Sequence, residues 1–159
     1  MSNWPIEKLN GKINIKHGFP FKGEFFSEQK TEFIVLTPGN FYEAGGFKRQ
    51  PGKEKFYTGE FPEEYIHSKG DVIVAITEQA AGLLGSCARV PESGLYLHNQ
   101  RLGLIKTNPQ YLLKDYVYYL FRTNTVREQI RLTSSGSKVK HTSPERIYDV
   151  KVPLPEVKE

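Results

Sequence analysis

Short apolar runs separated by turn residues fill the first hundred positions of the chain and predict a unit built mainly from strands. The strongest run, residues 72–77 (VIVAIT), is continuous and rich in β-branched residues, which predicts a strand buried on both faces. The turn into this strand is expected at residues 68–71. Weaker runs predict further strands at residues 13–15, 33–37, 88–90 and 102–106.

The pattern becomes helical after Pro109, which interrupts the series of strands. Apolar residues recur at helical spacing within residues 111–122 and predict a first helix. Val126 and Ile130 have the same spacing and predict a second helix, which we expect to end near Gly136.

A short helix and a final strand are expected next. Thr142 and Glu145 have the spacing of a capping box; alternatively, Ser143 caps the helix and Pro144 occupies its first turn. Apolar and polar residues alternate over residues 150–154, which predicts a strand. Strands followed by helices indicate an α+β fold, with a mainly antiparallel or mixed β platform in the N-terminal two thirds, then C-terminal helices and a final short strand.

The composition indicates one globular domain with a weak preference for an anionic partner. Of the 159 residues, 25% are charged and 38% are hydrophobic, which is typical of a folded chain. The net charge of +4 is compatible with nucleic acid binding but does not require it. Cys87 is the single cysteine, so no internal disulfide can form and a cytoplasmic location is expected. The N-terminal residues lack a signal-peptide core, and no apolar run approaches the roughly 20 residues of a membrane helix.

Residue constellations that carry out chemistry are missing from the sequence. It contains no nucleophile-elbow, P-loop or dinucleotide-binding motif, and its one cysteine and four scattered histidines do not have the spacing of metal ligands. Asn108-Pro109 continues as Gln110-Tyr111, which departs from the Asn-Pro-Pro-Tyr pattern of amino-methyltransferases. We therefore expect a protein without catalytic residues, bound metal or cofactor.

The most informative segment is residues 132–155, because it contains a hydroxyl-rich, cationic loop without any acid. Such a loop can donate hydrogen bonds and positive charge to the phosphates or base edges of an anionic polymer. The alternative is a helix C-cap glycine followed by a solvated basic turn. The candidate contacts in this loop are Ser135, Ser137, Lys138, Lys140 and His141.

Polar residues that follow the predicted buried strand are candidates for reading bases. In Thr77-Glu78-Gln79, the glutamine has the groups that pair with adenine and the glutamate could accept from cytosine N4. The alternative is a solvated turn between strands. Arg101 could form a bidentate pair with guanine, or the segment before it could instead satisfy backbone groups in a tight connection.

Three further cations lie in turns that are rich in aromatic residues and glycine. Lys22, Lys48 and Arg49 are candidate phosphate contacts, although runs of charge more often form solvated faces. The rings of Phe19 and Phe21, which precede Lys22, are expected to be core or lid residues.

A set of separated segments, in this order and spacing, resembles the target recognition domain of a type I restriction–modification specificity subunit. The segments are Trp4 with Leu9, residues 17–22 with Phe25-Phe26, residues 34–41, residues 69–77 with Gly82 and Gly85, residues 98–102, residues 116–121, residues 135–137 and residues 152–155.

The resemblance implies a sequence-specific DNA-binding module that recognises one half-site and has no chemistry of its own. Such subunits usually carry two of these domains, each followed by a long helix that sets the half-site distance and docks the methyltransferase. Here residues 1–155 form the expected single domain, and residues 156–159 stand where the spacer helix should begin, truncated or absent.

The same resemblance implies the partners. These are double-stranded DNA, a methyltransferase (modification) subunit that binds S-adenosylmethionine, and a restriction subunit, with either a homodimer or a second recognition domain supplying the other half-site. Two other interpretations stay open: a recognition fragment of a fused methyltransferase–nuclease enzyme, and an RNA- or protein-interaction domain.

Overall fold

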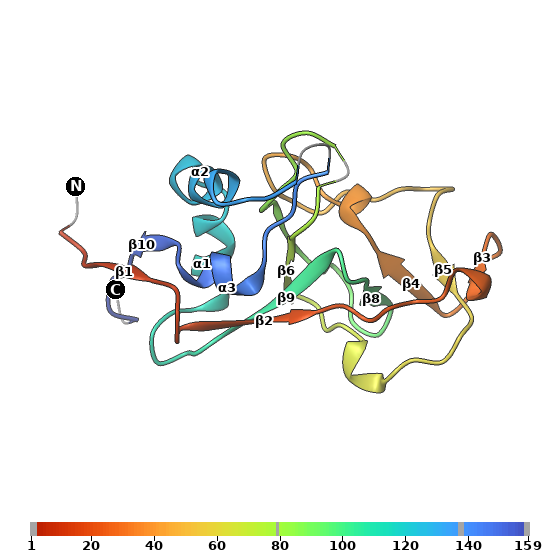
Figure 1. Cartoon of the computed structure of the whole chain (residues 1–159). Helices are drawn as coiled ribbons and strands as arrows, with labels where there is room; N and C mark the ends of the chain where they lie inside the picture. Colours follow the sequence, from red (N-terminus) through yellow and green to blue (C-terminus); the bar gives the residue numbers. More distant parts are fainter. Residues whose placement is uncertain (1–2, 79, 137–138, 158–159) are drawn as a thin grey trace.

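The computed structural model describes residues 3–78, 80–136 and 139–157. Within these ranges the chain forms ten strands in three sheets, three α-helices and three 3₁₀-helices. The two larger sheets occupy the middle and one end of the molecule, and the helices and a two-stranded ribbon occupy the other end (Figure 1). The expected α+β fold is confirmed.

The central sheet has antiparallel strands in the order β2 (Ile13–His17), β9 (Leu102–Thr107), β6 (Val72–Ala75) and β7 (Cys87–Arg89). The prediction that β6 is buried on both faces is confirmed. Val72 and Val74 pack with residues of the helices, and Ile73 and Ala75 pack with residues of the second sheet. The central sheet is therefore the middle layer of the fold.

The second sheet has the order β3 (Phe26–Ser27), β5 (Phe56–Tyr57), β4 (Phe33–Leu36) and β8 (Tyr96–His98), in which only β4 and β8 are parallel among these described strands. Aromatic side chains form its core. Phe21 packs edge-on against Tyr57 and Phe19, with ring centroids 4.8 and 5.1 Å apart, so both phenylalanines are packed residues as expected. The 3₁₀-helices η1 (Gly23–Phe25), η2 (Pro38–Asn40) and η3 (Glu63–Tyr65) connect these strands to the rest of the chain.

The helices cover the face of the central sheet that the second sheet leaves open. They are α1 (Lys114–Leu120), α2 (Asn124–Leu132) and α3 (Pro144–Tyr148), and the ribbon of β1 (Ile6–Lys8) and β10 (Lys151–Pro153) lies beyond them (Figure 1). None of the described helices is long and apolar enough to cross a lipid bilayer.

Two helix boundaries differ from their predictions, and a third decides between two predicted alternatives. Ser143 caps α3 by accepting from the Arg146 N–H, with Pro144 in the first turn, so the second of the two capping alternatives is correct. The first helix begins only after Leu113, which is extended. The second helix ends at Leu132 rather than near Gly136, which lies beyond the helix in a turn with φ of 101°.

The strands of both sheets share one end, here called the loop end, where β4, β6 and β8 stop and β9 starts. Leu36 pairs with His98 at the ends of β4 and β8, and Ala75 pairs with Leu102 between β6 and β9. Only residues 99–101 connect β8 of one sheet to β9 of the other. This short connection holds the two sheets together at the loop end.

Gly18 makes a second close connection between the sheets. A Cβ atom at this position would lie 2.0 Å from the carbonyl oxygen of Asn99. The Gly18 N–H donates to Leu102 O at 3.3 Å, and the Phe19 N–H donates to His98 O at 3.1 Å. The chain leaving β2 therefore passes from the central sheet onto the second sheet where no side chain fits.

A buried chain of imidazoles links the same strands from within. His67 and His98 are only 2% and 1% exposed, and His67 Nε2 lies 2.8 Å from His98 Nδ1. At one end of the chain, His67 Nδ1 lies 3.0 Å from Asp71 Oδ2. At the other end, His98 Nε2 lies 3.1 Å from the carbonyl oxygen of Lys16 in β2.

These contacts assign the protons of the two imidazoles. Because the Lys16 carbonyl only accepts, His98 Nε2 carries a proton and its Nδ1 accepts from His67 Nε2–H. Burial, with a smaller contribution from the neighbouring His67, lowers the pKa of His98 to about 3, so His98 stays neutral.

We expect the free energy of unfolding to fall as the pH drops below about 6.5, the ordinary pKa of an imidazole. Unfolded His98 takes up a proton there, whereas folded His98, with a pKa of about 3, does not. Because the unfolded state binds more protons, His98 lowers stability by up to about 1.4 kcal/mol per pH unit. Urea unfolding at about pH 7.5 and about pH 5 measures this slope. His98→Gln should have a shallower slope, and an equal slope would contradict the assignment.

We also expect Gly18→Ala to destabilise the protein, because the added methyl group collides with the Asn99 carbonyl. Forced overpacking of this kind costs about 1–3 kcal/mol. Gly23→Ala is the matched control, since nothing lies within 4 Å of a Cβ placed there. Thermal unfolding of both variants tests the close approach, which would be refuted if the two melted at the same temperature.

Candidate nucleic-acid interface

Two of the candidate loops are hydrogen-bonded to each other at the loop end. Thr77 and His141 form a β-bridge, and the Glu78 N–H donates to Lys140 O at 3.0 Å. Ser135 and His141 exchange a pair of backbone hydrogen bonds at 3.0 and 2.9 Å. Segments that lie far apart in the sequence therefore form one small ribbon (Figure 1).

The turn that carries the cationic loop depends on Gly136. Its φ is 101°, and a Cβ there would lie 2.2 Å from the Val139 carbonyl oxygen. This glycine lets Ser135 and His141 face each other across the turn. Three candidate contacts, Gln79, Ser137 and Lys138, lie outside the described residues.

Arg101 lies next to this ribbon. Its carbonyl oxygen accepts from the Ile76 N–H at 3.0 Å, and its own N–H donates to Asn99 Oδ1 at 3.0 Å. The Asn99 side chain thus satisfies a backbone group in a tight connection, which was the alternative expectation for this segment. The Arg101 side chain is nevertheless exposed, and the residue immediately precedes β9, the neighbour of the strand that Thr77 extends.

A third loop, residues 41–48, reaches the same end of the sheets. Phe41 and Phe47 form a bridge, and the Gly46 N–H donates to Cys87 O at 2.8 Å where β7 begins. The exposed Lys48 follows, with its Nζ 5.7 Å from the ring centroid of Tyr42. Lys48 therefore accompanies the candidates of the other two loops.

Two candidate cations lie elsewhere. Arg49 donates to Glu92 at 3.1 Å and to the Tyr96 hydroxyl at 3.3 Å, near the opposite end of the strands, and these contacts raise its pKa. Lys22 is exposed, and its N–H donates to the Tyr57 hydroxyl on the second sheet at 3.2 Å. Neither residue makes a described contact with the ribbon of Thr77 and His141.

Arg127 of α2 holds the loops in place from below. Its guanidinium donates to three carbonyl oxygens in two loops: Glu43 at 2.5 Å, Gly82 at 2.6 Å and Leu84 at 3.1 Å. Half-burial lowers the pKa of Arg127. These hydrogen bonds fix the loop of residues 41–48 relative to the loop that follows Thr77. Arg127 was not among the predicted contacts, because its only signal in the sequence is its place beside the apolar positions Val126 and Ile130.

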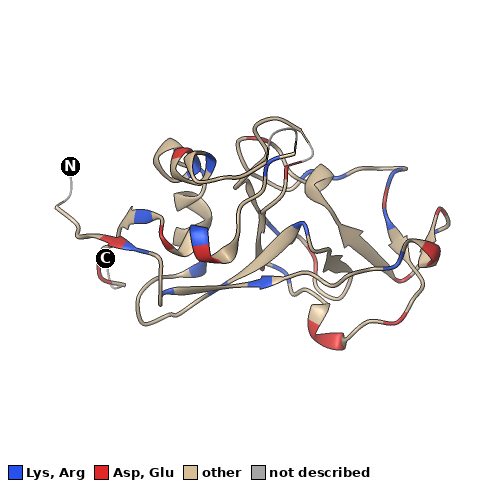
Figure 2. Cartoon of the chain, viewed as in Figure 1, with Lys and Arg blue, Asp and Glu red and all other residues tan. Residues whose placement is uncertain are grey.

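A groove of about 620 Å³ runs between these loops and α2. It is lined by Glu78, Ala81, Gly82, Leu84, Asn124, Arg127, Glu128, Arg131 and Lys140. Lysine and arginine positions lie near these loops, and acidic positions lie among them (Figure 2). The groove thus offers both donors and acceptors to a polar ligand.

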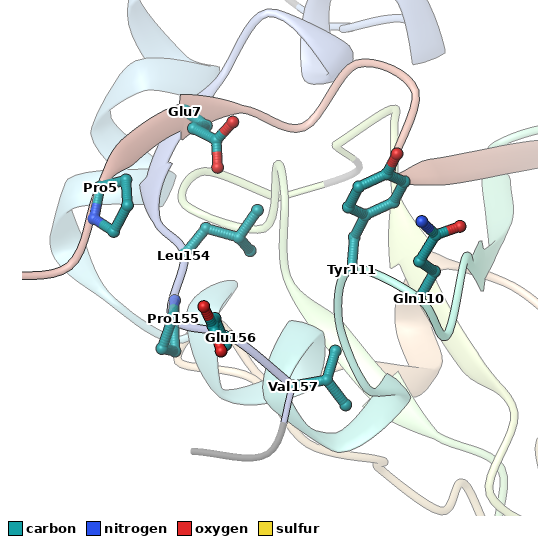
Figure 3. Close-up of a pocket in the computed structure, with 8 residues that line it drawn as sticks. All are labelled: Pro5, Glu7, Gln110, Tyr111, Leu154, Pro155, Glu156 and Val157. Atoms are coloured by element: carbon teal, nitrogen blue, oxygen red, sulfur yellow. The ribbon is translucent and has the colours of Figure 1, made fainter.

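A hollow of similar size, about 610 Å³, lies between the β1–β10 ribbon and Tyr111 (Figure 3). It is lined by Pro5, Glu7, Gln110, Tyr111, Leu154, Pro155, Glu156 and Val157. None of the candidate contacts lines it, so the loop end remains the candidate site.

The described loops carry cations, hydroxyl groups, a carboxylate and an imidazole within one surface. Phosphates accept from cations and hydroxyl groups, and base edges pair with carboxylates and guanidinium groups. No group of three or more potential metal ligands occurs among the described residues. The arrangement is therefore suited to hydrogen-bonded recognition of an anionic polymer.

The fold is similar to solved S subunits of type I restriction–modification systems, although neither a family model nor a curated protein matches the chain. The S subunit from M. genitalium has a TM-score of 0.60 and 12% identity over 94% of this chain. The HsdS subunit from Thermoanaerobacter tengcongensis has a TM-score of 0.64 and 14% identity over 98%. A chain from a study of complex assembly and conformational transition of the type I R-M system has a TM-score of 0.67 and 12% identity over 99%.

This chain spans about a third of those proteins, covering 33%, 34% and 35% of their lengths. The expected fold of a target recognition domain is thereby confirmed. Identities this low establish the fold and leave the function to the chemistry of the site.

We expect Arg127→Ala to lower the free energy of unfolding by about 2–3 kcal/mol, because it leaves three carbonyl acceptors without their charged donor. Arg131→Ala is the matched control one turn later on α2, because its guanidinium pairs with Glu128 on the surface, where ion pairs contribute little to stability. Urea unfolding measures both, and equal losses would show that Arg127 does not hold the loops.

Proposed function

We propose that this chain is a sequence-specific DNA-binding module of a type I restriction–modification specificity subunit. It reads one half-site and directs a methyltransferase and restriction complex to it. The proposal is supported by the fold shared with solved S subunits. The single observation that carries it is the bridge between Thr77 and His141, which joins two polar loops into one surface.

The proposed contacts divide into positioning and reading. Lys22, Lys48, Arg49, Lys138 and Lys140 hold the phosphates of the duplex, and of these Lys48 and Lys140 lie at the loop end within the described residues. For Arg49 this role requires release from Glu92. A lysine ammonium suits phosphate because it presents three donors and a compact charge.

The groups that read bases surround the ribbon. Their hydrogen-bonding capacities differ: the Glu78 carboxylate accepts, the Arg101 guanidinium donates, and hydroxyl groups do both. Because a wrong base leaves such a group unpaired, each good pair discriminates by about 1–3 kcal/mol. The proposed set is Thr77, Glu78, Gln79, Arg101, Ser135, Ser137 and His141.

The proposed partners supply what this module does not. In the assembly, a methyltransferase subunit binds S-adenosylmethionine and extrudes the target base, and a restriction subunit cleaves. A second recognition domain, or a second copy of this chain, reads the other half-site. We place the assembly in the cytoplasm.

A selection from random duplexes tests the proposal. We expect enrichment of a short sequence, measured at low salt because a single half-site lacks the avidity of a pair. Competition with single-stranded DNA and with RNA follows on the selected sequence. Preference for RNA, or no sequence enrichment at any salt concentration, would refute the proposed function.

Two substitutions separate positioning from reading. Lys140→Gln should weaken binding to all sequences and flatten the plot of log K against log salt by about one unit, because one phosphate contact is lost. Thr77→Val keeps the shape of the side chain and removes its hydroxyl, so it should change the preference at one base pair and keep the salt slope. Lys106→Gln, an exposed cation on β9 away from the loops, is the control for lost charge. Identical effects of Lys140→Gln and Lys106→Gln would contradict the assignment of Lys140.

A further inference from the structure

A continuous ridge of cations and aromatic rings runs from the loop of residues 41–48 along α1 and β7. We call it the cation–aromatic ridge, and its members are Lys48, Tyr42, Arg122, Tyr118, Arg89 and Tyr119. Only Lys48 belongs to the candidate contacts already described. The ridge is therefore a surface that the proposed function does not yet use.

Neighbouring members of the ridge either contact each other or meet around Gly46. Lys48 lies over Tyr42 at 5.7 Å from its ring centroid. A Cβ on Gly46 would lie 3.8 Å from Tyr42 Cδ2, 3.8 Å from Arg122 Nη1 and 3.9 Å from the Tyr118 hydroxyl, so these side chains converge there. Arg122 also donates to the Tyr118 hydroxyl at 2.7 Å.

Arg89 completes the ridge at the surface of α1. Its guanidinium carbon lies 4.2 Å from the ring centroid of Tyr118 and 5.5 Å from that of Tyr119. Asp115 is the acid that pairs with it, at 3.4 Å. With Lys48 and Arg122, the ridge carries three cations against this one paired acid, so its charge suits an anionic ligand.

The ridge is fixed in place and accessible to solvent. Tyr42 and Tyr119 are 53% and 57% exposed, whereas Tyr118 is only 6% exposed and anchors the ridge to the core. A guanidinium stacked on a ring loses less side-chain freedom on binding, and the Arg89 side chain is still 40% exposed. Rigid cations of this kind bind phosphate at a lower entropic cost than free ones.

The geometry argues against base stacking on this ridge. Arg89 already stacks on the Tyr118 ring, and Lys48 lies over the Tyr42 ring. Single-strand binders need open aromatic faces on which successive bases stack. What the ridge presents instead is N–H and hydroxyl donors, which are the groups that phosphate oxygens accept.

We propose that the cation–aromatic ridge binds the sugar–phosphate backbone of the same duplex, beside the base pairs that the loops read. This inference rests on the proposed function. It is supported by continuity: the Gly46 N–H joins the loop of residues 41–48 to Cys87 at the start of β7, and Arg89 lies two residues further along that edge strand. The footprint of the protein is thus longer than the sequence it recognises.

The test compares duplexes that share the selected sequence but differ in flanking length, about two against about twelve base pairs on each side. The double variant Arg89→Gln/Arg122→Gln should bind the short duplex as the wild type does. It should bind the long duplex roughly 10-fold more weakly, with a salt slope flatter by about two units. Lys106→Gln/Lys151→Gln removes the same charge from exposed positions on β9 and β10 and is the matched control.

Each outcome of this comparison either supports or overturns the inference. If the double variant keeps the full gain from the flanks, or loses affinity equally for both duplexes, the ridge does not bind flanking backbone and an acidic protein surface becomes the ligand to test. Thermal unfolding checks that the variants are folded, and the single charge reversal Arg122→Glu, at an exposed position, replaces the double variant if that one unfolds. If the wild type binds neither duplex, the proposed function itself fails. If the wild type binds both duplexes and the ridge variants bind them as the control variant does, this inference alone fails.

Discussion

The three-residue connection at 99–101 is the constraint from which the rest of the molecule follows. It passes directly from the last strand of one sheet into the central strands of the other, so the two sheets must meet at a common end. Gly18 reinforces this junction, since the chain leaving β2 passes within contact of the Asn99 backbone. The imidazoles of His67 and His98 tie the same strands together in the interior. Loops that leave different sheets are thereby gathered on one surface.

The gathered loops have little regular structure of their own, and their order comes from a few well-placed contacts. The bridge between Thr77 and His141 joins two of them, and Arg127 joins the loop after Thr77 to the loop of residues 41–48 through backbone carbonyl groups. A recognition surface needs this combination, because side chains that read bases must be held to within a fraction of an ångström while the loops remain exposed to the ligand. The strands form the rigid platform, and the loops carry the polar side chains.

Much of the fold could be predicted from local pattern, whereas the assembly of the site could not. The run at residues 72–77 identified the buried central strand, because every position is apolar or β-branched. The two-residue strands β3 and β5 are too short to show a periodicity and escaped prediction. The candidate loops were identified by their polar residues, but their meeting depends on the bridge between Thr77 and His141, which are 64 positions apart. The role of Arg127 could not be predicted for a related reason. Its partners are backbone carbonyl groups of distant residues, and every residue has such a group, so the sequence does not identify them.

The way in which Arg127 holds its loops has an evolutionary consequence. Carbonyl oxygens are common to all twenty amino acids, so the anchor tolerates almost any replacement of the side chains it supports. Exposed positions such as Ala80 and Ala81 can therefore diversify while the backbone beneath them keeps its shape. If the loops bind a ligand as proposed, substitutions in the loop residues alone can change the target while the fold stays the same.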